Sequence, residues 1–404
     1  MLKLFQINTT YSWTSTGRIA VEIGQKVMEY GWESYIAYGR YIIPGTSHAI
    51  KIGNKLDVYN HVLQTRLWDL HGLASKRATL QLIQKIKEVQ PDIIHLHNIH
   101  GYYLNYPILF DFLASVDIPI VWTLHDCWTF TGHCAYYTYA KCERWKSGCH
   151  HCPQKKAYPA TLFLDNSSFN YELKKKYFTR LKNLTLIPVS NWLKNELKQS
   201  FLKNYPIQVI NNGIDLKIFK PSEPTYKSKN GLEGKYIVLG VASVWEDRKG
   251  LNDFISLSKV LSDKYQIILV GLSPKQIKAL PDSIIGINRT NNIHELAELY
   301  AAADVFVNPT WEDNFPTTNL EALACGTPVI TYRTGGSIEA IDDQTGTIVN
   351  PGDIENLAKE IEKICNREDY REMSNSCRER AVRLYDKQQR YEAYYQLYLN
   401  LLKG

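Results

Sequence analysis

The feature that most constrains the fold is an alternation of short apolar runs with longer amphipathic segments, which begins near residue 3 and begins again near residue 236. In the first half the runs expected to form strands are 3–8, 34–37, 93–96, 118–124, 185–189 and 207–210. In the second half they are 236–242, 266–271, 304–308, 327–332 and 346–349. This alternation is typical of parallel sheets covered by helices. The sequence therefore predicts an α/β protein with two doubly wound domains.

The domain boundary is expected where the alternation stops. Residues 212–234 are polar, contain two prolines and lack a sustained apolar period, as expected of a linker. We predict an N-terminal domain over 1–214, a second domain over 215–384 and a packing helix over 385–404. Ligands of doubly wound sheets bind beyond the carboxyl ends of the strands. Two such sheets facing each other would place a ligand cleft between the domains.

Charge and composition narrow the classes of partner. The 404 residues are 44% hydrophobic and 22% charged, which excludes a disordered or collagen-like chain. The N-terminal apolar stretch is too short for a signal peptide, and Asp111 and Asp117 interrupt the longest apolar region, so we expect a cytoplasmic protein. Residues 1–214 carry a net charge of +10 and the remainder −4. Such a basic half suits phosphates or an acidic membrane. Nucleic acid is the weakest of the candidate partners, because the sequence contains no recognisable nucleic-acid-binding motif. A solvated surface explains the charge equally well.

The strongest local signal is the segment 308–330. A strand is expected to end near Asn308, and a loop then leads to a helix with Pro316 in its first turn and Gly326 just past its end. The free amides near Thr317 and Thr318 would form an anion site. Glu321 follows Thr317 by four residues, so its carboxylate shares that face and could bind both hydroxyls of a ribose. The plain alternative is an ordinary helix with a solvated glutamate.

This segment resembles the nucleotide-sugar site of the family-4 retaining glycosyltransferases, which have the GT-B fold. The family motif has two acidic residues separated by seven, followed by Ala-x-Ala-x-Gly-x-Pro-Val, and Asp313 and Glu321 have this spacing. The resemblance implies that the first acid contacts the donor sugar and the second the ribose. The first acid is normally Glu, so Glu312 is a second candidate for the sugar contact. The donor-binding residues implied here are Glu312, Asn314, Phe315, Thr317, Thr318 and Glu321, with Asp313 counted as catalytic.

Other matches extend the resemblance along the chain. Asn212-Gly-Ile-Asp215 resembles the family's linker motif, and Tyr300-Ala-Ala-Ala-Asp304 and Thr334-Gly335-Gly336 match the same domain. Arg248 and Lys249 resemble the basic pair that neutralises the donor diphosphate, although alone they would indicate a surface turn. The arginine that many relatives carry five positions before this lysine is Val244 here.

In the first domain, His125 and Asp126 follow a predicted strand where family members carry a histidine close to the transferred sugar. Gly17 fits a loop that lets a diphosphate or acceptor approach the backbone. His95, His97, His100 and the stretch 69–79 are candidate acceptor-side residues.

The resemblance implies transfer of a sugar from a nucleoside diphosphate to a hydroxyl group with retained anomeric configuration. The negative charge that develops on the departing diphosphate must then be stabilised. Because the sequence has no Asp-x-Asp motif to hold a divalent metal, we expect Arg248, Lys249 and the helix amides to stabilise this charge without a metal. Two alternatives remain open, which are a non-hydrolysing sugar-nucleotide 2-epimerase and a non-catalytic scaffold. The basic first half favours a lipid-linked saccharide acceptor in capsule, O-antigen or exopolysaccharide assembly. We expect binding to the inner face of an anionic membrane, with an interfacial helix around Lys174, Lys175 and Lys176. The alternative is that the aromatic side chains of this segment face the core and its lysines face water.

Five of the eight cysteines lie between residues 127 and 152. Cys134, Cys142, Cys149 and Cys152 have the spacing C-x7-C-x6-C-x2-C, with His133, His150 and His151 nearby. Disulfides are unusual in cytoplasmic proteins, so the pattern favours a structural zinc site over a disulfide. Four reduced cysteines in a loop remain the alternative.

Overall fold

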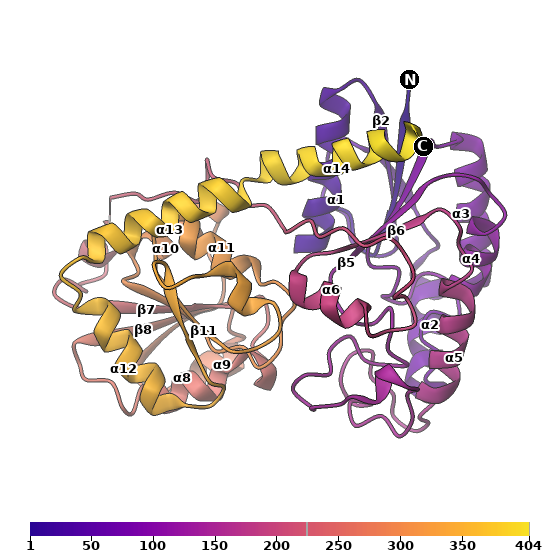
Figure 1. The fold of residues 1–404 in the computed structure, drawn as a ribbon. Coiled ribbons are helices and arrows are strands. Elements are labelled where there is room, and N and C mark those ends of the chain that lie inside the picture. The colour runs from indigo at the N-terminus through magenta and orange to yellow at the C-terminus, as the bar shows by residue number, and fades with distance from the viewer. Residues whose placement is uncertain (224, 404) are drawn as a thin grey trace. The chain divides into compact units, whose positions relative to one another are not determined.

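The chain folds into two units, and the computed structural model describes residues 1–223 and 225–403. Unit 1 contains residues 1–211 and 390–404, and unit 2 contains residues 212–389 (Figure 1). The first crossing between the units therefore lies close to the predicted boundary at Ile214. Two details differ from the expectation. The segment 212–234, expected as a linker, belongs to unit 2, and most of the C-terminal helix belongs to unit 1.

Unit 1 is built around a parallel sheet of six described strands, in the order β3-β2-β1-β4-β5-β6. The strands are β1 (Lys3–Asn8), β2 (Glu33–Tyr38), β3 (His48–Lys51), β4 (Ile93–Leu96), β5 (Ile120–Leu124) and β6 (Leu184–Pro188). The helices are α1 (Ser15–Glu29), α2 (Lys55–Trp68), α3 (Lys76–Val89), α4 (Tyr106–Leu113), α5 (Ser167–Phe178) and α6 (Asn191–Leu197), with a 3-10 turn η1 (Arg144–Lys146). The strand order reverses between β1 and β4, which makes the carboxyl ends of these strands the expected ligand edge.

Helix α14 (Lys387–Lys403) completes the core of unit 1. Its buried tyrosines pack with Ile19, Ile23 and Trp32 on one face of the sheet. Their hydroxyl groups are also hydrogen-bonded in the interior. Tyr391 donates to Glu22 at 2.5 Å, Tyr394 bonds with Thr123 at 3.0 Å, and Tyr398 bonds with His95 at 2.7 Å. Buried phenols with satisfied hydroxyls allow aromatic burial without an unpaired polar group.

Unit 2 repeats the same topology with a second parallel sheet of six described strands, in the order β12-β11-β10-β7-β8-β9. The strands are β7 (Tyr236–Val241), β8 (Tyr265–Val270), β9 (Ile284–Ile287), β10 (Val305–Asn308), β11 (Val329–Tyr332) and β12 (Gly346–Val349). The helices are α7 (Thr225–Lys229), α8 (Leu251–Leu257), α9 (Pro274–Lys278), α10 (Ile293–Ala302), α11 (Thr317–Ala324), α12 (Ile354–Cys365) and α13 (Tyr370–Tyr385), with 3-10 turns η2 (Asp247–Lys249) and η3 (Ser337–Ala340). Here the order reverses between β7 and β10.

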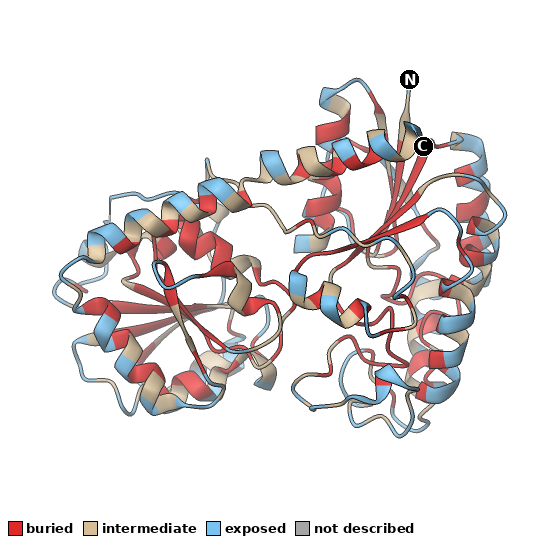
Figure 2. Cartoon of the chain, in the orientation of Figure 1, coloured by how far each residue is buried: buried red, intermediate tan, exposed pale blue. Residues whose placement is uncertain are grey.

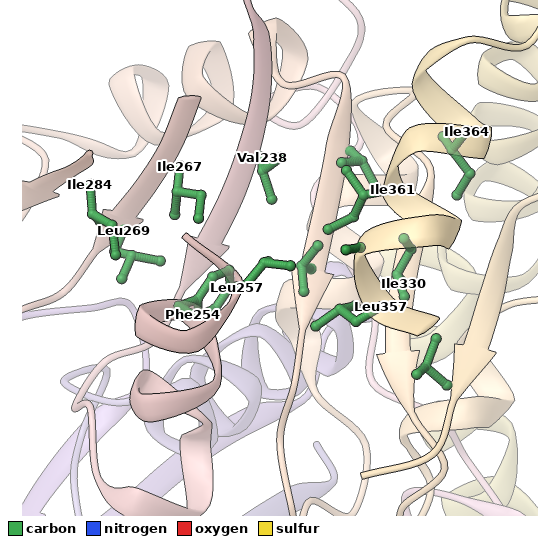
Figure 3. Packing of buried hydrophobic residues seen from close by; sticks show 14 of the residues in the cluster. Val238, Phe254, Leu257, Ile267, Leu269, Ile284, Ile330, Leu357, Ile361 and Ile364 are labelled. Atoms are coloured by element: carbon green, nitrogen blue, oxygen red, sulfur yellow. The ribbon is translucent and has the colours of Figure 1, made fainter. Parts of the chain in front are cut away.

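Both sheets are buried and the helices expose their outer faces (Figure 2). In unit 2 the core lies between the sheet and the helices α8 and α12. Val238 and Ile330 from the strands meet Phe254 of α8 and Leu357 and Ile361 of α12 (Figure 3). This continuous apolar packing explains why the strands carry near-uniform hydrophobic runs, as parallel strands covered on both faces do. None of the described helices is long and apolar enough to cross a membrane.

Most predicted strands agree with the structure, and three regions differ. The predicted strand over 207–210 forms only an isolated bridge between Ile207 and Leu186. Strands β3 and β9 were not predicted. β3 is a short, mostly exposed edge strand without a clear apolar pattern. β9 is an apolar run of only four residues that a glycine interrupts.

Candidate active site

In unit 2, a lysine and an aspartate meet where the strand order reverses. Lys249 ends η2, which follows β7, and Asp313 lies in the loop after β10. The Lys249 Nζ and an Asp313 carboxylate oxygen are 2.5 Å apart, and both side chains are partly exposed. Gly250 turns the chain with a φ of +78°, and a Cβ there would come within 2.3 Å of the Pro309 carbonyl oxygen. Only glycine therefore allows η2 to lie this close to the loop after β10.

The loop that carries Asp313 is fixed by its backbone. The Gly336 amide donates to the Asp313 carbonyl at 3.2 Å, and a Cβ on Gly335 would lie 1.9 Å from the same oxygen. Glu312 is buried at 3% exposure, whereas Asp313 is partly exposed and pairs with Lys249. Of the two candidate acids, Asp313 thus has the more accessible carboxylate.

Arg248 lies beside Lys249 but has different contacts. Its side chain forms an ion pair with Glu246 at 3.0 Å, and its carbonyl accepts from the Trp311 amide at 2.8 Å. Trp311 in turn donates its indole N–H to Asp253 at 2.9 Å. Arg248 therefore joins the two loops through its backbone, and Lys249 is the cation that reaches Asp313.

The helix after this loop begins one residue later than predicted. α11 starts at Thr317, and Pro316 is the residue before it rather than part of its first turn. No side chain caps this helix end, and Thr317 and Thr318 are partly exposed. Gly326 follows the helix with a φ of +80°, as the sequence predicted. The uncapped amides and the helix dipole favour an anion at this end.

Glu321 is held inside unit 2 rather than solvated. Its exposure is 7%, and the Tyr300 hydroxyl donates to its carboxylate at 2.9 Å. Burial and the Glu321 charge hold the pKa of Tyr300 well above its usual range, so this hydroxyl stays protonated. The ordinary solvated glutamate considered from the sequence is therefore wrong. Asn314 and Phe315 are also buried, at 2% and 4% exposure.

In unit 1, histidines gather at the carboxyl ends of β4 and β5. His97 Nδ1 lies 3.4 Å from His125 Nε2, and His97 Nε2 bonds with Gln6 at 3.0 Å. Burial lowers the pKa of His125 to about 4 and the pKa of His97 well below 6.5. Both rings are therefore neutral at pH 7. Because His125 is only partly buried, it is the ring of this pair with access to a ligand.

Asp126 belongs to a second group that includes His100 and Tyr158. His100 Nε2 lies 2.8 Å from Asp126, and His100 Nδ1 lies 2.9 Å from the Tyr158 hydroxyl. Burial raises the pKa of Asp126, but His100 and the Trp128 amide outweigh this effect and the net pKa is lowered. Asp126 is therefore an ionised carboxylate at neutral pH. Tyr158 carries no local sequence signal, because it reaches His100 only through the folding of the loop.

Gly17 has a packing explanation in the structure. A Cβ at this position would lie 2.7 Å from the Thr10 hydroxyl and 2.8 Å from the Ser12 amide. Its own amide donates to the N-cap side chain of Thr14 at 3.3 Å. Glycine therefore lets the loop after β1 close onto the start of α1.

The expected basic face of α5 is only partly present. Lys175 and Lys176 are exposed, but Lys174 is buried at 1% exposure. Its ammonium donates to the Trp128 carbonyl at 2.6 Å and lies 3.5 Å from the centre of the Trp128 ring. Tyr171 and Phe178 are buried as well. The expectation that Lys174 faces a membrane is therefore wrong, because this side of α5 packs inside unit 1.

The clustered cysteines come together in space. Cys134, Cys142, Cys149 and Cys152 line one pocket with His133. All four are reduced, and Cys127 lies nearby in the core. Within residues 1–223 and 225–403, no group of three or more His, Cys, Asp or Glu side chains lies in an arrangement that could hold a metal ion as it stands.

Comparisons with known proteins cover both units. Residues 17–218 match the model of Glycosyltransferase Family 4, and residues 235–367 match that of Glycosyl transferases group 1. WcaC of Escherichia coli (strain K12), a glycosyl transferase assigned to colanic acid biosynthesis, is 24% identical over 379 residues, which is 89% of this chain and 90% of WcaC.

Two further matches bear on ligands. The N,N'-diacetylbacillosaminyl-diphospho-undecaprenol alpha-1,3-N-acetylgalactosaminyltransferase of Campylobacter jejuni is 29% identical over 166 residues, covering 37% of this chain and 43% of that protein. Anabaena HepE, solved with UDP and glucose, superposes with a TM-score of 0.68 at 14% identity, covering 98% of this chain and 99% of HepE. The structural likeness supports the GT-B fold.

Proposed function

The chain belongs to glycosyltransferase family 4, and from this premise we propose that it moves a sugar from a nucleoside-diphosphate donor to a hydroxyl group of a saccharide, with retention. The observation that carries the proposal is the Lys249–Asp313 pair at 2.5 Å, beside the uncapped start of α11. An ammonium and a free helix N-terminus together offer positive potential where a diphosphate would lie. The neighbouring carboxylate offers a hydrogen-bond acceptor for sugar hydroxyls.

In this proposal, unit 2 binds the donor. Lys249 and the α11 amides stabilise the negative charge that develops on the departing diphosphate, and no metal is required for that step. Glu321, oriented by Tyr300, accepts hydrogen bonds from the ribose hydroxyls. Asp313 contacts the transferred sugar. UDP, GDP and ADP sugars share the diphosphate, the ribose and the transferred sugar that these groups would bind, so each of them fits the site.

The transfer step exchanges one bond for another at the anomeric carbon. The acceptor oxygen forms the new glycosidic bond on the same face from which the phosphate oxygen departs. The acceptor proton passes to that phosphate oxygen, so the enzyme supplies no covalent nucleophile. His125 is neutral at pH 7 and acts as a hydrogen-bonding group for the transferred sugar. Asp126 stays ionised and positions His100.

We further propose that the acceptor is lipid-linked and that the product enters a cell-surface polysaccharide. The names of the E. coli and C. jejuni relatives support this assignment, and so does the net charge of +10 over residues 1–214. An anionic lipid diphosphate and an acidic bilayer would both be attracted to such a unit. With Lys174 buried, Lys175 and Lys176 remain as the cations of α5 for membrane contact.

The first test is a thermal-shift panel of UDP, GDP and ADP sugars, followed by product analysis with one stabilising donor and short saccharide acceptors. We expect one nucleotide to raise the melting temperature and one sugar to appear on an acceptor with its anomeric configuration retained. Epimerised nucleotide sugar formed without acceptor would instead support the epimerase alternative. Unchanged activity in Lys249→Ala and Glu321→Ala proteins would support a non-catalytic scaffold.

Membrane binding has its own test. Co-sedimentation with anionic vesicles should occur at low salt and weaken as salt increases. Lys175→Glu with Lys176→Glu should reduce it, and Lys259→Glu in unit 2 serves as the exposed control. Absence of binding at low salt would overturn the membrane proposal without affecting the transfer reaction.

A further inference from the structure

The four clustered cysteines lie in one pocket although they are far apart in the loop. Cys134, Cys142, Cys149 and Cys152 all line this pocket, together with His133 and His150. The remaining walls come from Thr131, Tyr137, Trp145 and neighbouring loop residues. Four sulfur atoms on one partly closed pocket are an unusual arrangement for inert thiols, which normally disperse among apolar side chains.

The backbone near the pocket already presents a donor to sulfur. The Gly132 amide donates to Cys149 Sγ at 3.1 Å. A Cβ on Gly132 would lie 2.1 Å from the Ser167 carbonyl oxygen and 2.7 Å from Cys149 Cβ. Any larger residue at 132 would therefore push Cys149 away. Amide donors of this kind stabilise thiolates at metal sites.

A buried cation also lies beside the thiols. Lys174 donates to the carbonyls of Trp128 and Thr131 at 2.6 and 3.0 Å and forms no ion pair with a carboxylate among the described residues. Burying an ammonium without an anionic partner is costly. Four thiolates around a divalent ion carry a net charge of −2, which would supply the missing compensation.

His133 gives a second independent observation. Its side chain is fully buried and lines the pocket, and its Nδ1 is 2.6 Å from Asp69. Its Nε2 has no hydrogen-bond partner in the structure. A buried, unpartnered ring nitrogen beside four thiols indicates that something polar is missing from the pocket.

We propose that this pocket binds one zinc ion through the thiolates of Cys134, Cys142, Cys149 and Cys152. Zinc prefers four sulfur ligands in tetrahedral geometry, and the Cys149-x2-Cys152 spacing is that of a zinc knuckle. On binding, the four thiols lose their protons and converge on the ion. Lys174 balances the charge of the site, and the His133 ring contacts it from outside the ligand set.

The zinc site would have a positioning role in unit 1. Hydrogen bonds connect the pocket to Asp126. Lys174 donates to the carbonyls of Thr131 and Trp128, and the Trp128 amide donates to Asp126 at 3.0 Å. The loop that carries Asp126 would therefore be fixed by the metal. This inference does not depend on the proposed transfer reaction, since zinc content is measured without it.

The test is metal analysis of the full chain purified without chelator. We expect about one zinc per chain, retained in His133→Gln and in the control Cys365→Ala of unit 2, and lost in Cys142→Ser and Cys149→Ser. Cobalt exchanged into the wild-type protein should give the intense sulfur-to-cobalt absorption of a tetrathiolate site. These wild-type measurements decide the question even if a cysteine variant fails to fold.

Several results would overturn the proposal. They are zinc-free protein with eight titratable thiols, two fewer thiols under denaturing non-reducing conditions because of a disulfide, or iron in place of zinc. Loss of zinc in His133→Gln but not in Cys142→Ser would overturn the tetrathiolate assignment. Hydrogen exchange over residues 126–152 should increase when zinc is removed, while exchange over β7 and β10 of unit 2 should not change.

Discussion

The two units share one strand order and differ in what they place at the carboxyl ends of their inner strands. After β10 and β7, unit 2 places a carboxylate and an ammonium that pair at 2.5 Å. After β4 and β5, unit 1 places the neutral imidazoles of His97 and His125, and an ionised Asp126 that bonds with His100. One topology thus supports two kinds of surface. An ammonium near a helix N-terminus suits a diphosphate, and neutral donors and acceptors suit the hydroxyls of a saccharide.

The difference is sharpest in the response to acid. Burial lowers the pKa of His61 to about 3 and of His125 to about 4, and those of His71, His95 and His97 well below 6.5. Between these values and pH 6.5, the unfolded chain binds protons that the folded chain does not. Stability is therefore fully present above pH 6.5 and falls as the pH drops toward 4, by up to about 1.4 kcal/mol per pH unit for each histidine.

All five of these histidines belong to unit 1, and unit 2 contains only His294. We expect acid to unfold unit 1 first. Hydrogen exchange from pH 7.5 to 4.5, corrected for the intrinsic rate, should show loss of protection in β4 and β5 before β7 and β10. Simultaneous loss in both units would contradict this difference between them.

The next largest effect is expected from Lys249→Ala. Without the ammonium, the charge on the departing diphosphate loses its main side-chain partner, and kcat/KM should fall about 100- to 1000-fold. Lys259→Ala, which removes an exposed lysine of the same unit, is the matched control. A loss confined to the acceptor KM would place Lys249 outside the donor site.

Replacing Glu321 should weaken donor binding by a smaller amount. Loss of hydrogen bonds from a charged carboxylate to the ribose costs about 1.5–3 kcal/mol, or about a 10- to 150-fold rise in the Kd of the nucleotide. Tyr300→Phe, which removes only the hydroxyl that orients Glu321, should cost less. Calorimetry with the nucleotide that the thermal-shift panel selects measures both, and an unchanged Kd for Glu321→Ala would remove the ribose assignment. Asp313→Asn should mainly slow transfer, with little change in nucleotide Kd.

The smallest expected effect comes from Tyr158→Phe in unit 1. This change removes the hydroxyl that bonds with His100 at 2.9 Å, and a hydrogen bond of this kind is worth about 0.5–1.5 kcal/mol. The acceptor KM should rise a few-fold while the nucleotide Kd stays the same. A change in nucleotide Kd instead would break the division of donor and acceptor between the units.

Much of the fold could be predicted from the sequence because parallel buried strands leave uniform apolar runs. The loop after β10 and the helix that follows it could also be predicted from the sequence, because Asp313, Pro316, Glu321 and Gly326 lie within one segment. The contacts of Lys174 could not be predicted. Nothing in the local sequence distinguishes Lys174 from the two lysines that follow it. Only the packing of α5 against Trp128 makes Lys174 a buried cation. The hydrogen bond between Tyr158 and His100 is hidden for the same reason, because it joins residues that are distant in sequence.

Because α14 belongs to the core of unit 1, the order of synthesis affects when unit 1 can complete its folding. Residues 390–404 supply three tyrosines to the core of unit 1, yet all of unit 2 is translated before them. At about 5–20 residues per second, roughly 10 to 40 seconds separate the emergence of the first and second parts of this unit. During that interval the patch around Ile19, Ile23 and Trp32 has no cover, whereas unit 2 has all of its residues available as soon as it is made. The half of the protein that is synthesised first is thus the half that finishes folding last, and it is the half that a chaperone would need to protect.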